Sequence, residues 1–271
     1  MTSLRSLAVL LGAAFAASCS LYDRNEPRKI TAPLPGSRIK FHNFSAGSVG
    51  VNFFANDVKM SAVTNTVCTN PVPADTLACR TTGIESTAGT TYGNLATGGL
   101  YLAIAPGQYT LASKIAARDT VVSSVSQTIA DGKYYSFYMS GVYNATTKTA
   151  EAFVIEDPIP SGQINYAVAS VRFVNAIPNA SGDFTLYAKN TTTGTETAIG
   201  PAVAYKNAGA FVSLAPGVYD LGARLPGQST NFTGLSATTV SFFGGRAYTI
   251  TARGSTATTS TLALTGTLNQ R

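Results

Sequence analysis

The chain is short of charged residues. Only 12% of its 271 residues are Asp, Glu, Lys or Arg, against about 25% in average soluble domains. Long surface helices need Lys, Glu and Arg on their polar face, so this composition favours strands and turns instead. The hydrophobic fraction of 45% also excludes intrinsic disorder, which requires low hydrophobicity and high charge.

Groups that could perform catalysis are scarce. His42 is the one histidine, and it alternates with Lys40 on a predicted strand, which places it on a face toward solvent or a second domain. No Gly-x-Ser-x-Gly motif is present. The one adjacent pair of acids, Glu156-Asp157, could contribute to a Ca²⁺ site, but a solvated linker needs fewer assumptions. We therefore expect no enzyme activity, no cofactor and no metal site.

The N-terminus has the features of a secretion signal. Arg5 precedes an apolar run over 7–17, which is too short to span a bilayer. The run ends in Ala16-Ala17-Ser18-Cys19, which resembles the bacterial lipobox and predicts lipid attachment at Cys19. Cleavage at Ala14-Phe15-Ala16 is the alternative. A lipid-anchored protein of the bacterial cell envelope is expected, and Ser20 resembles an outer-membrane sorting signal, with the exposed membrane face left open.

Three cysteines are present, at positions 19, 68 and 79. If Cys19 carries lipid, Cys68 and Cys79 remain as an even pair in an oxidising compartment, which predicts a disulfide. Their spacing and the lack of a nearby histidine disfavour zinc.

The formal net charge is +6. Several basic residues follow Cys19, including Arg24, Arg28 and Lys29, and they could attract anionic lipid or could simply solvate a linker. Nucleic-acid binding is not expected, because the basic residues are dispersed and no binding motif is present.

The chain repeats itself once. Four blocks recur in the same order: 39–43 matches 171–175, 51–55 matches 184–188, 105–111 matches 215–221 and 132–136 matches 245–249. Two copies of this length predict tandem domains rather than a solenoid. The expected organisation is a signal peptide over 1–18, a stalk over 19–36, a first domain over 37–157, a linker over 158–164 and a second domain over 165–271.

Both units are predicted to be all-β. Phe184, Leu186 and Ala188 alternate with polar or exposed positions, as in a half-buried strand. Gly and Pro recur at short intervals, which favours two antiparallel β-sandwiches. In the Ala-Pro-Gly-x-Tyr block, Tyr109 and Tyr219 are expected to bury their rings and bond their hydroxyls to nearby backbone.

The second unit carries a family resemblance. Val171-Arg172-Phe173-Val174-Asn175-Ala176, the later Ala-Pro-Gly-x-Tyr block and Gly245-Arg246-Ala247-Tyr248-Thr249 resemble domain of unknown function 4397, an envelope module often found in tandem in lipoproteins. The first unit resembles it more loosely. The resemblance implies immunoglobulin-like or prealbumin-like sandwiches and implies no activity.

The first unit contains an insertion over about 56–97. It uses 43 residues from Ala55 to Thr97 where the second unit uses 18 from Ala188 to Tyr205. The insertion holds the cysteine pair and Asn70, and could be a binding loop or a stiffened hairpin. Together with Tyr92 and Tyr101 it provides a candidate binding surface.

The leading hypothesis is a non-catalytic, lipid-anchored structural or interaction protein of the cell envelope. The alternative is a protein that binds carbohydrate or peptidoglycan through the insertion and its tyrosines. The expected partners are the membrane, through the anchor, and an envelope protein or glycan.

Overall fold

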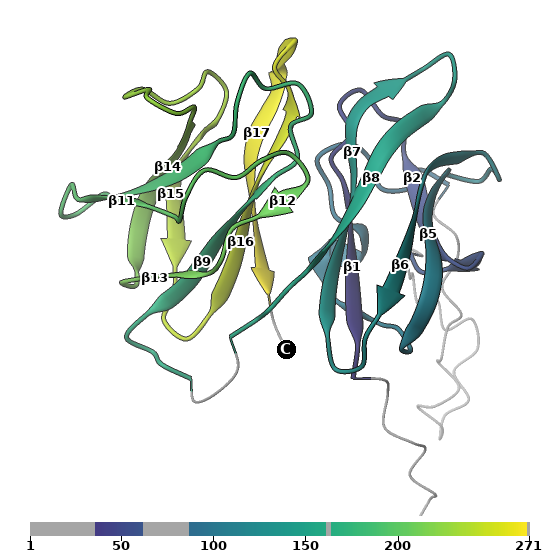
Figure 1. Ribbon diagram of the computed structural model, residues 1–271, viewed down its shortest axis with the longest axis horizontal. Coiled ribbons are helices and arrows are strands. Elements are labelled where there is room, and N and C mark those ends of the chain that lie inside the picture. Colours follow the sequence, from purple (N-terminus) through teal and green to yellow (C-terminus); the bar gives the residue numbers. More distant parts are fainter. Residues whose placement is uncertain (1–35, 62–86, 161–163, 270–271) are drawn as a thin grey trace, which may run out of the picture. The chain divides into compact units, whose positions relative to one another are not determined.

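The computed structural model describes residues 36–61, 87–160 and 164–269, and these residues form an all-β protein (Figure 1). One short 3-10 turn, η2 (Ala96–Gly99), interrupts the strands. The strands are β1 (Arg38–Asn43), β2 (Val51–Ala55), β3 (Val58–Lys59), β4 (Leu102–Ala103), β5 (Gly107–Ile115), β6 (Val121–Ile129), β7 (Tyr134–Asn144), β8 (Thr149–Glu156), β9 (Ala169–Asn175), β10 (Thr185–Asn190), β11 (Glu196–Ala198), β12 (Asn207–Ala208), β13 (Val212–Leu214), β14 (Gly217–Arg224), β15 (Ser236–Phe242), β16 (Ala247–Ser255) and β17 (Thr258–Asn269).

Each repeat builds two sheets with the same topology, which confirms the predicted β-sandwich class. We call 37–157 the first repeat and 165–271 the second repeat. The first repeat has sheets β4-β1-β7-β8 and β3-β2-β5-β6. The second has β12-β9-β16-β17, in which β13 also pairs with β9, and β11-β10-β14-β15. Strand β13 pairs with β9 as β4 pairs with β1, and β12 is an addition of the second repeat. Most pairs are antiparallel. One pair in each repeat is parallel, β1 with β7 and β9 with β16, at equivalent places.

Strands β1, β9 and β16 are buried over most of their length, and β7 is buried from Tyr135 to Gly141, because both faces of these strands are covered there. On β1, Ile39 and Phe41 point into the first sandwich, and Lys40 and His42 alternate with them on the opposite face. On β9, Val171 and Phe173 belong to the core of the second sandwich and Arg172 lies between them in sequence. The second face of each strand is therefore covered by something outside its own sandwich.

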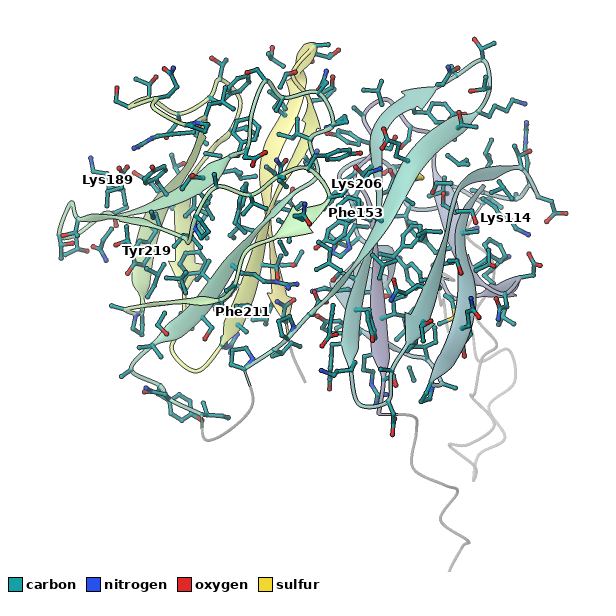
Figure 2. The ribbon with its side chains drawn as sticks, viewed as in Figure 1. Lys114, Phe153, Lys189, Lys206, Phe211 and Tyr219 are labelled. Carbon is teal, nitrogen blue, oxygen red and sulfur yellow. The ribbon has the colours of Figure 1, made fainter. Side chains whose placement is uncertain are left out.

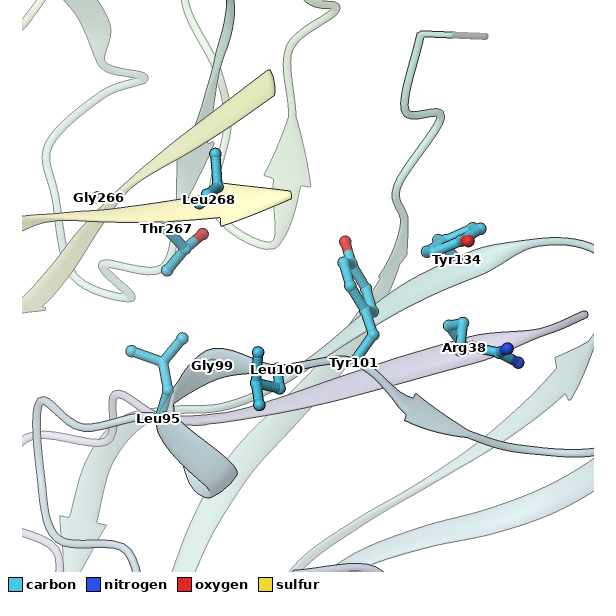
Figure 3. Close-up of a pocket in the computed structure, with 10 residues that line it drawn as sticks. Arg38, Leu95, Gly99, Leu100, Tyr101, Tyr134, Gly266, Thr267 and Leu268 are labelled. Atoms are coloured by element: carbon cyan, nitrogen blue, oxygen red, sulfur yellow. The ribbon is translucent and has the colours of Figure 1, made fainter. Parts of the chain in front are cut away.

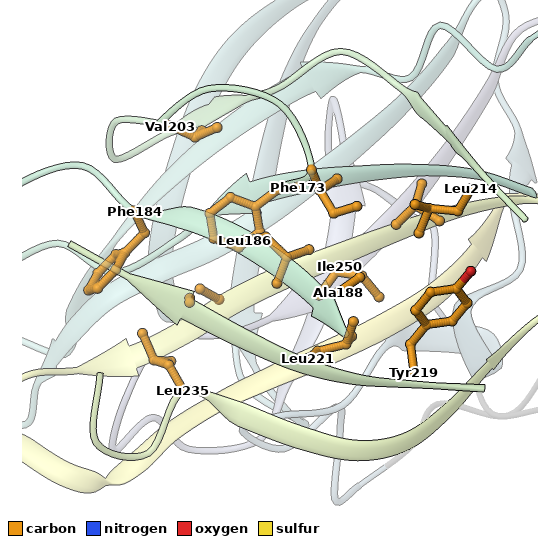
Figure 4. Close-up of a cluster of buried hydrophobic side chains, with 14 of the residues drawn as sticks. Phe173, Phe184, Leu186, Ala188, Val203, Leu214, Tyr219, Leu221, Leu235 and Ile250 are labelled. Carbon is orange, nitrogen blue, oxygen red and sulfur yellow. The ribbon is translucent and has the colours of Figure 1, made fainter. Parts of the chain in front are cut away.

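The two sandwich cores use different side chains. The first is centred on aromatic contacts, with ring centroids of Phe41 and Phe53 5.1 Å apart and those of Phe53 and Phe137 5.6 Å apart. The second holds more aliphatic side chains, including Leu186 and Leu221 (Figure 4). Because the hydrophobic effect is non-directional, one topology accommodates both fillings.

Tyr219 confirms the structural role predicted for the Ala-Pro-Gly-x-Tyr block. Its ring belongs to the core of the second sandwich (Figures 2 and 4), and its hydroxyl donates a hydrogen bond of 2.7 Å to the carbonyl oxygen of Ala215. The equivalent Tyr109 packs against the first core and is only half-buried.

Within the described ranges, no helix has the length and apolar character needed to cross a membrane.

Candidate functional site

The covered second faces meet at a junction between the repeats. We call this surface the junction. Residues 35–271 form one compact unit, and an apolar cluster in it draws side chains from both repeats: Phe44, Tyr138 and Phe153 from the first, Val174 and Ala176 from the second. The ring centroids of Phe153 and Tyr205 lie 6.2 Å apart across it. The junction is therefore a third hydrophobic core, separate from the two sandwich cores.

A buried ion pair lies beside this apolar cluster. Arg172 Nη2 pairs with Asp157 Oδ1, and both side chains are essentially inaccessible to solvent. Arg172 also donates from Nε to Thr249 Oγ1 at 2.9 Å and from Nη1 to the carbonyl oxygen of Glu156 at 3.1 Å. Asp157 Oδ2 accepts a hydrogen bond of 2.6 Å from Ser136. The ends of the first repeat and the start of the second are thereby joined by charge-assisted bonds.

Lys40 occupies the same place in the first repeat that Arg172 occupies in the second. In its parallel pair Lys40 lies opposite Ser136, and Arg172 lies opposite Thr249. Lys40 Nζ donates to Asn269 Oδ1, and it lies 4.6 Å from the ring centroid of Tyr101. The two repeats therefore meet with their equivalent basic residues in one buried polar network.

Tyr101 and Asn269 complete this network. The Tyr101 hydroxyl donates to Asp157 Oδ2 at 2.6 Å and lies 3.3 Å from Asn269 Oδ1. Asn269 Nδ2 donates to Thr249 Oγ1 at 2.7 Å. Every charge in the network has a hydrogen-bonding partner, as a buried charge requires.

Burial shifts the pKa values of Lys40 and Tyr101 in directions that favour their neutral forms. Burial lowers the pKa of Lys40 to about 8, with Asp157 opposing and Arg172 reinforcing the change. Burial, together with the nearby charge and hydrogen bond of Asp157, raises the pKa of Tyr101. Lys40 is thus mostly protonated at neutral pH and becomes neutral in mildly alkaline solution.

His42 lies at the junction and is fully buried. Its ring stacks on Tyr138 with centroids 4.3 Å apart, and its Nδ1 lies 3.0 Å from the carbonyl oxygen of Phe137. Burial and the charge of Lys40 lower its pKa well below the ordinary value, so the ring is neutral. The sequence predicted that His42 faces either solvent or a second domain. In the structure His42 packs in the junction, so its face is turned toward the second repeat and not toward solvent.

The structure corrects the interpretation of Glu156-Asp157 as a solvated linker. Glu156 is exposed and pairs with Lys133, but Asp157 is buried and paired with Arg172. The sequence pattern was misleading because the following prolines suggested an exposed connection, whereas Asp157, directly after strand β8, lies in the junction.

In the described part of the chain, no group of three or more His, Cys, Asp or Glu side chains could hold a metal ion.

A cavity of about 610 Å³ opens beside the network (Figure 3). Tyr101 and Tyr134 line it with their rings in an edge-to-face pair, with centroids 5.0 Å apart. Arg38, Leu100 and Leu268 also contribute to its wall. This lining can contact a ligand through aromatic, apolar and basic groups, and contains no acid, histidine or cysteine.

Two of the predicted binding residues turn toward the second repeat. The Tyr92 hydroxyl donates to the carbonyl oxygen of Thr261 at 2.5 Å, and Arg253 lies 4.8 Å from the Tyr92 ring centroid. Tyr101 takes part in the network and in the cavity wall. The two tyrosines are placed at different parts of the junction, and their role in ligand binding stays a prediction. Asn70, the predicted Cys68–Cys79 disulfide and the predicted lipidation site Cys19 lie outside the described residues.

Sequence reasoning missed the central residues of the network, Arg172, Asp157 and Asn269. A signal for one pair was present: Lys40 and Arg172 each stand between two apolar core residues at equivalent positions of the repeats. A charge that recurs at one place on a buried strand indicates that the strand has a second covered face.

The second repeat matches a known protein family. Residues 169–271 match the family described as "Domain of unknown function (DUF4397)". This match confirms the resemblance drawn from the sequence blocks of that repeat. No curated protein matches the chain.

Two solved structures were found to be similar. A candidate cell adhesion protein from Bacteroides ovatus is 12% identical, with 88% of this chain and 97% of that chain covered and a TM-score of 0.24. A candidate cell adhesion protein from Bacteroides fragilis is 8% identical, with 86% and 98% covered and a TM-score of 0.23.

Proposed function

We propose that this protein is a non-catalytic, lipid-anchored interaction protein of the bacterial cell envelope, in which the two repeats act as one unit. The junction is the observation that carries the proposal. The buried Lys40, Asp157 and Arg172 are engaged in joining the repeats, and the His42 ring is stacked on Tyr138 of the apolar cluster. These groups therefore have a structural role.

The lipid anchor is supported by the sequence Ala16-Ala17-Ser18-Cys19. Cells expressing the full chain should incorporate labelled palmitate into it, and Cys19→Ala should abolish the label. Cys68→Ala is the matched control, because it removes a different cysteine and should keep the label. Label that persists in Cys19→Ala would refute the anchor.

The interaction role is tested by crosslinking in intact cells, followed by identification of the crosslinked proteins. An envelope protein should be recovered with the chain, and less of it should be recovered with Arg172→Met, which weakens the junction. A chain that crosslinks to no protein would contradict the interaction role.

The cavity supports a second candidate function, binding of a carbohydrate. Aromatic faces suit sugar rings, and Tyr101 and Tyr134 present their rings at its wall. A glycan array should then show binding that Tyr134→Ala removes and Tyr143→Ala keeps, because Tyr143 is not among the residues that line this cavity. An array without any bound glycan would leave the structural role alone.

A further inference from the structure

Exposed apolar side chains gather at the turn between β15 and β16. Ile164, Tyr166 and Phe243 are 62%, 73% and 58% exposed. A Cβ atom built on Gly245 would lie 2.6 Å from Ile164 and 3.1 Å from Tyr166, so both side chains pack directly on this glycine. Phe243 precedes the same turn. We call Ile164, Tyr166 and Phe243 the apolar tip.

The fold of the repeat does not require these side chains. In the first repeat, the turn between β6 and β7 has exposed Ala130 where the second has Phe243. Both turns contain the same hydrogen bond: Ala130 N donates to the Tyr135 hydroxyl at 3.1 Å, and Phe243 N donates to the Tyr248 hydroxyl at 3.1 Å. Because the same turn forms with Ala130, the turn itself does not require an aromatic side chain at position 243.

A basic residue accompanies the apolar tip. Arg246 is exposed, and its guanidinium carbon lies 5.5 Å from the ring centroid of Phe243. The matching Lys133 of the first repeat is engaged with Glu156 at 2.8 Å. Aromatic and aliphatic side chains next to an exposed cation are the composition that inserts at the boundary of an anionic bilayer.

The chain enters the structure at the same end. Gly36, the first described residue, contacts Gly132 in the β6–β7 turn. The starts of β1 and β7 adjoin the starts of β9 and β16, because Arg172 Nη1 bonds the Glu156 carbonyl oxygen and Lys40 bonds Asn269, which lies opposite Ala247. Gly36 and the apolar tip therefore lie at one end of the unit.

The length of the stalk places this end near the membrane. Residues 20–37 separate Cys19 from β1. A flexible chain of this length spans about 20–25 Å on average, and about 60 Å when fully extended. A lipid on Cys19 thus keeps the apolar tip within reach of the bilayer surface.

We propose that the apolar tip and Arg246 form a second membrane contact, which inserts at the boundary of an anionic lipid bilayer and orients the anchored unit. This inference rests on the lipid anchor of the proposed function. Two attachments resist dissociation and rotation far better than one, because the second binds at high effective concentration.

The absence of tryptophan from the chain provides a direct test. Phe243→Trp places a unique fluorophore in the apolar tip. Val142→Trp is the matched control, since Val142 is 55% exposed and lies near the end of β7, at the opposite end of the sheet. Each lipidated full-length variant is reconstituted into vesicles of phosphatidylcholine and phosphatidylglycerol that carry brominated acyl chains.

Interfacial side chains lie about 5–10 Å into the headgroup and acyl boundary, so bromine should reduce the fluorescence of Phe243→Trp about twofold and leave Val142→Trp unchanged. Equal quenching of both, or of neither while both proteins sediment with the vesicles, overturns the membrane contact and leaves the anchor intact. Failure of both to sediment identifies a failed anchor instead. A blue shift of Phe243→Trp that rises with protein concentration in lipid-free detergent would assign the apolar tip to a second copy of the chain, which also overturns the proposal.

Discussion

The two repeats share a topology and differ in the chemistry of their junction faces. Lys40 and Arg172 occupy equivalent positions, yet Arg172 makes bonds to Asp157, Thr249 and the Glu156 backbone, whereas Lys40 bonds to the neutral Asn269. A guanidinium offers a planar fork of donors, and an ammonium is a compact and strongly hydrated point charge. The shared fold determines the position of the cation in each repeat. The groups that surround each cation determine how much its burial costs.

Substitutions at the two equivalent cations should have unequal effects at neutral pH. Arg172→Met leaves Asp157 buried without its partner and should lower the free energy of unfolding by about 3–5 kcal/mol. Lys40→Met removes a cation that has no buried counterion bonded to it, and should change stability far less. Urea unfolding measures both. Lys133→Met is the control, because its pair with Glu156 is exposed and contributes little to stability. Equal losses for Arg172→Met and Lys40→Met would refute the comparison.

Alkaline pH should further distinguish the contribution of Lys40 to stability from that of Arg172. The pKa of Lys40 is lowered from 10.5 to about 8 in the folded chain, so between these values the unfolded chain binds more protons and stability rises with pH. From pH 8 to pH 10 the wild type should gain about 2 kcal/mol relative to Lys40→Met. Comparing the two proteins cancels the opposing ionisation of tyrosines, whose pKa values burial raises. A difference that stays constant with pH would contradict burial of a protonated Lys40.

In acid, His42 should make stability depend on pH, whereas its equivalent Val174 cannot. The pKa of His42 is lowered in the folded chain, so the unfolded chain binds more protons below about pH 6.5 and stability falls as the pH decreases. His42 should lower the free energy of unfolding by up to about 1.4 kcal/mol for each pH unit of acidification. His42→Val should remove this contribution. Thermal unfolding at pH 7 and pH 5 measures it. An identical acid dependence in wild type and His42→Val would show that another group is responsible.

The tyrosines of the Ala-Pro-Gly-x-Tyr blocks should differ least. Tyr219→Phe removes a hydrogen bond from a buried hydroxyl and should cost about 1 kcal/mol. Tyr109→Phe should cost less, because Tyr109 is half-buried and water can reach it. Chemical denaturation of both variants makes the comparison, and a larger cost at Tyr109 would reverse it.

Much of the architecture could be predicted from the sequence. Alternation of Phe184, Leu186 and Ala188 gave the correct strand, and recurrence of the four blocks anticipated two copies of one topology. These predictions succeed because side-chain alternation and turn residues are local properties. The same reasoning failed at Asp157, since a carboxylate before two prolines has the same local pattern whether or not a distant arginine covers it.

The candidate site could be predicted from the sequence only in part. Tyr101 was predicted as a binding residue, and it lines the cavity, but its hydroxyl is committed to Asp157. The residues that surround it are Lys40 on β1, Asp157 just after β8, Arg172 on β9 and Asn269 on β17, and the first and last of them are 229 residues apart in the chain. No spacing rule relates such distant positions.

The sequence by itself determined the all-β class, the repeat and the burial of the core faces, because these follow from local periodicity. The tertiary structure alone decided that the remaining faces of β1, β7, β9 and β16 pack together. Their polar residues, Lys40, Ser136, Arg172 and Thr249, are ordinary surface residues in each isolated pattern. They become a buried network because the two repeats bring the equivalent sheet faces into contact, where each charge must find a partner in place of water.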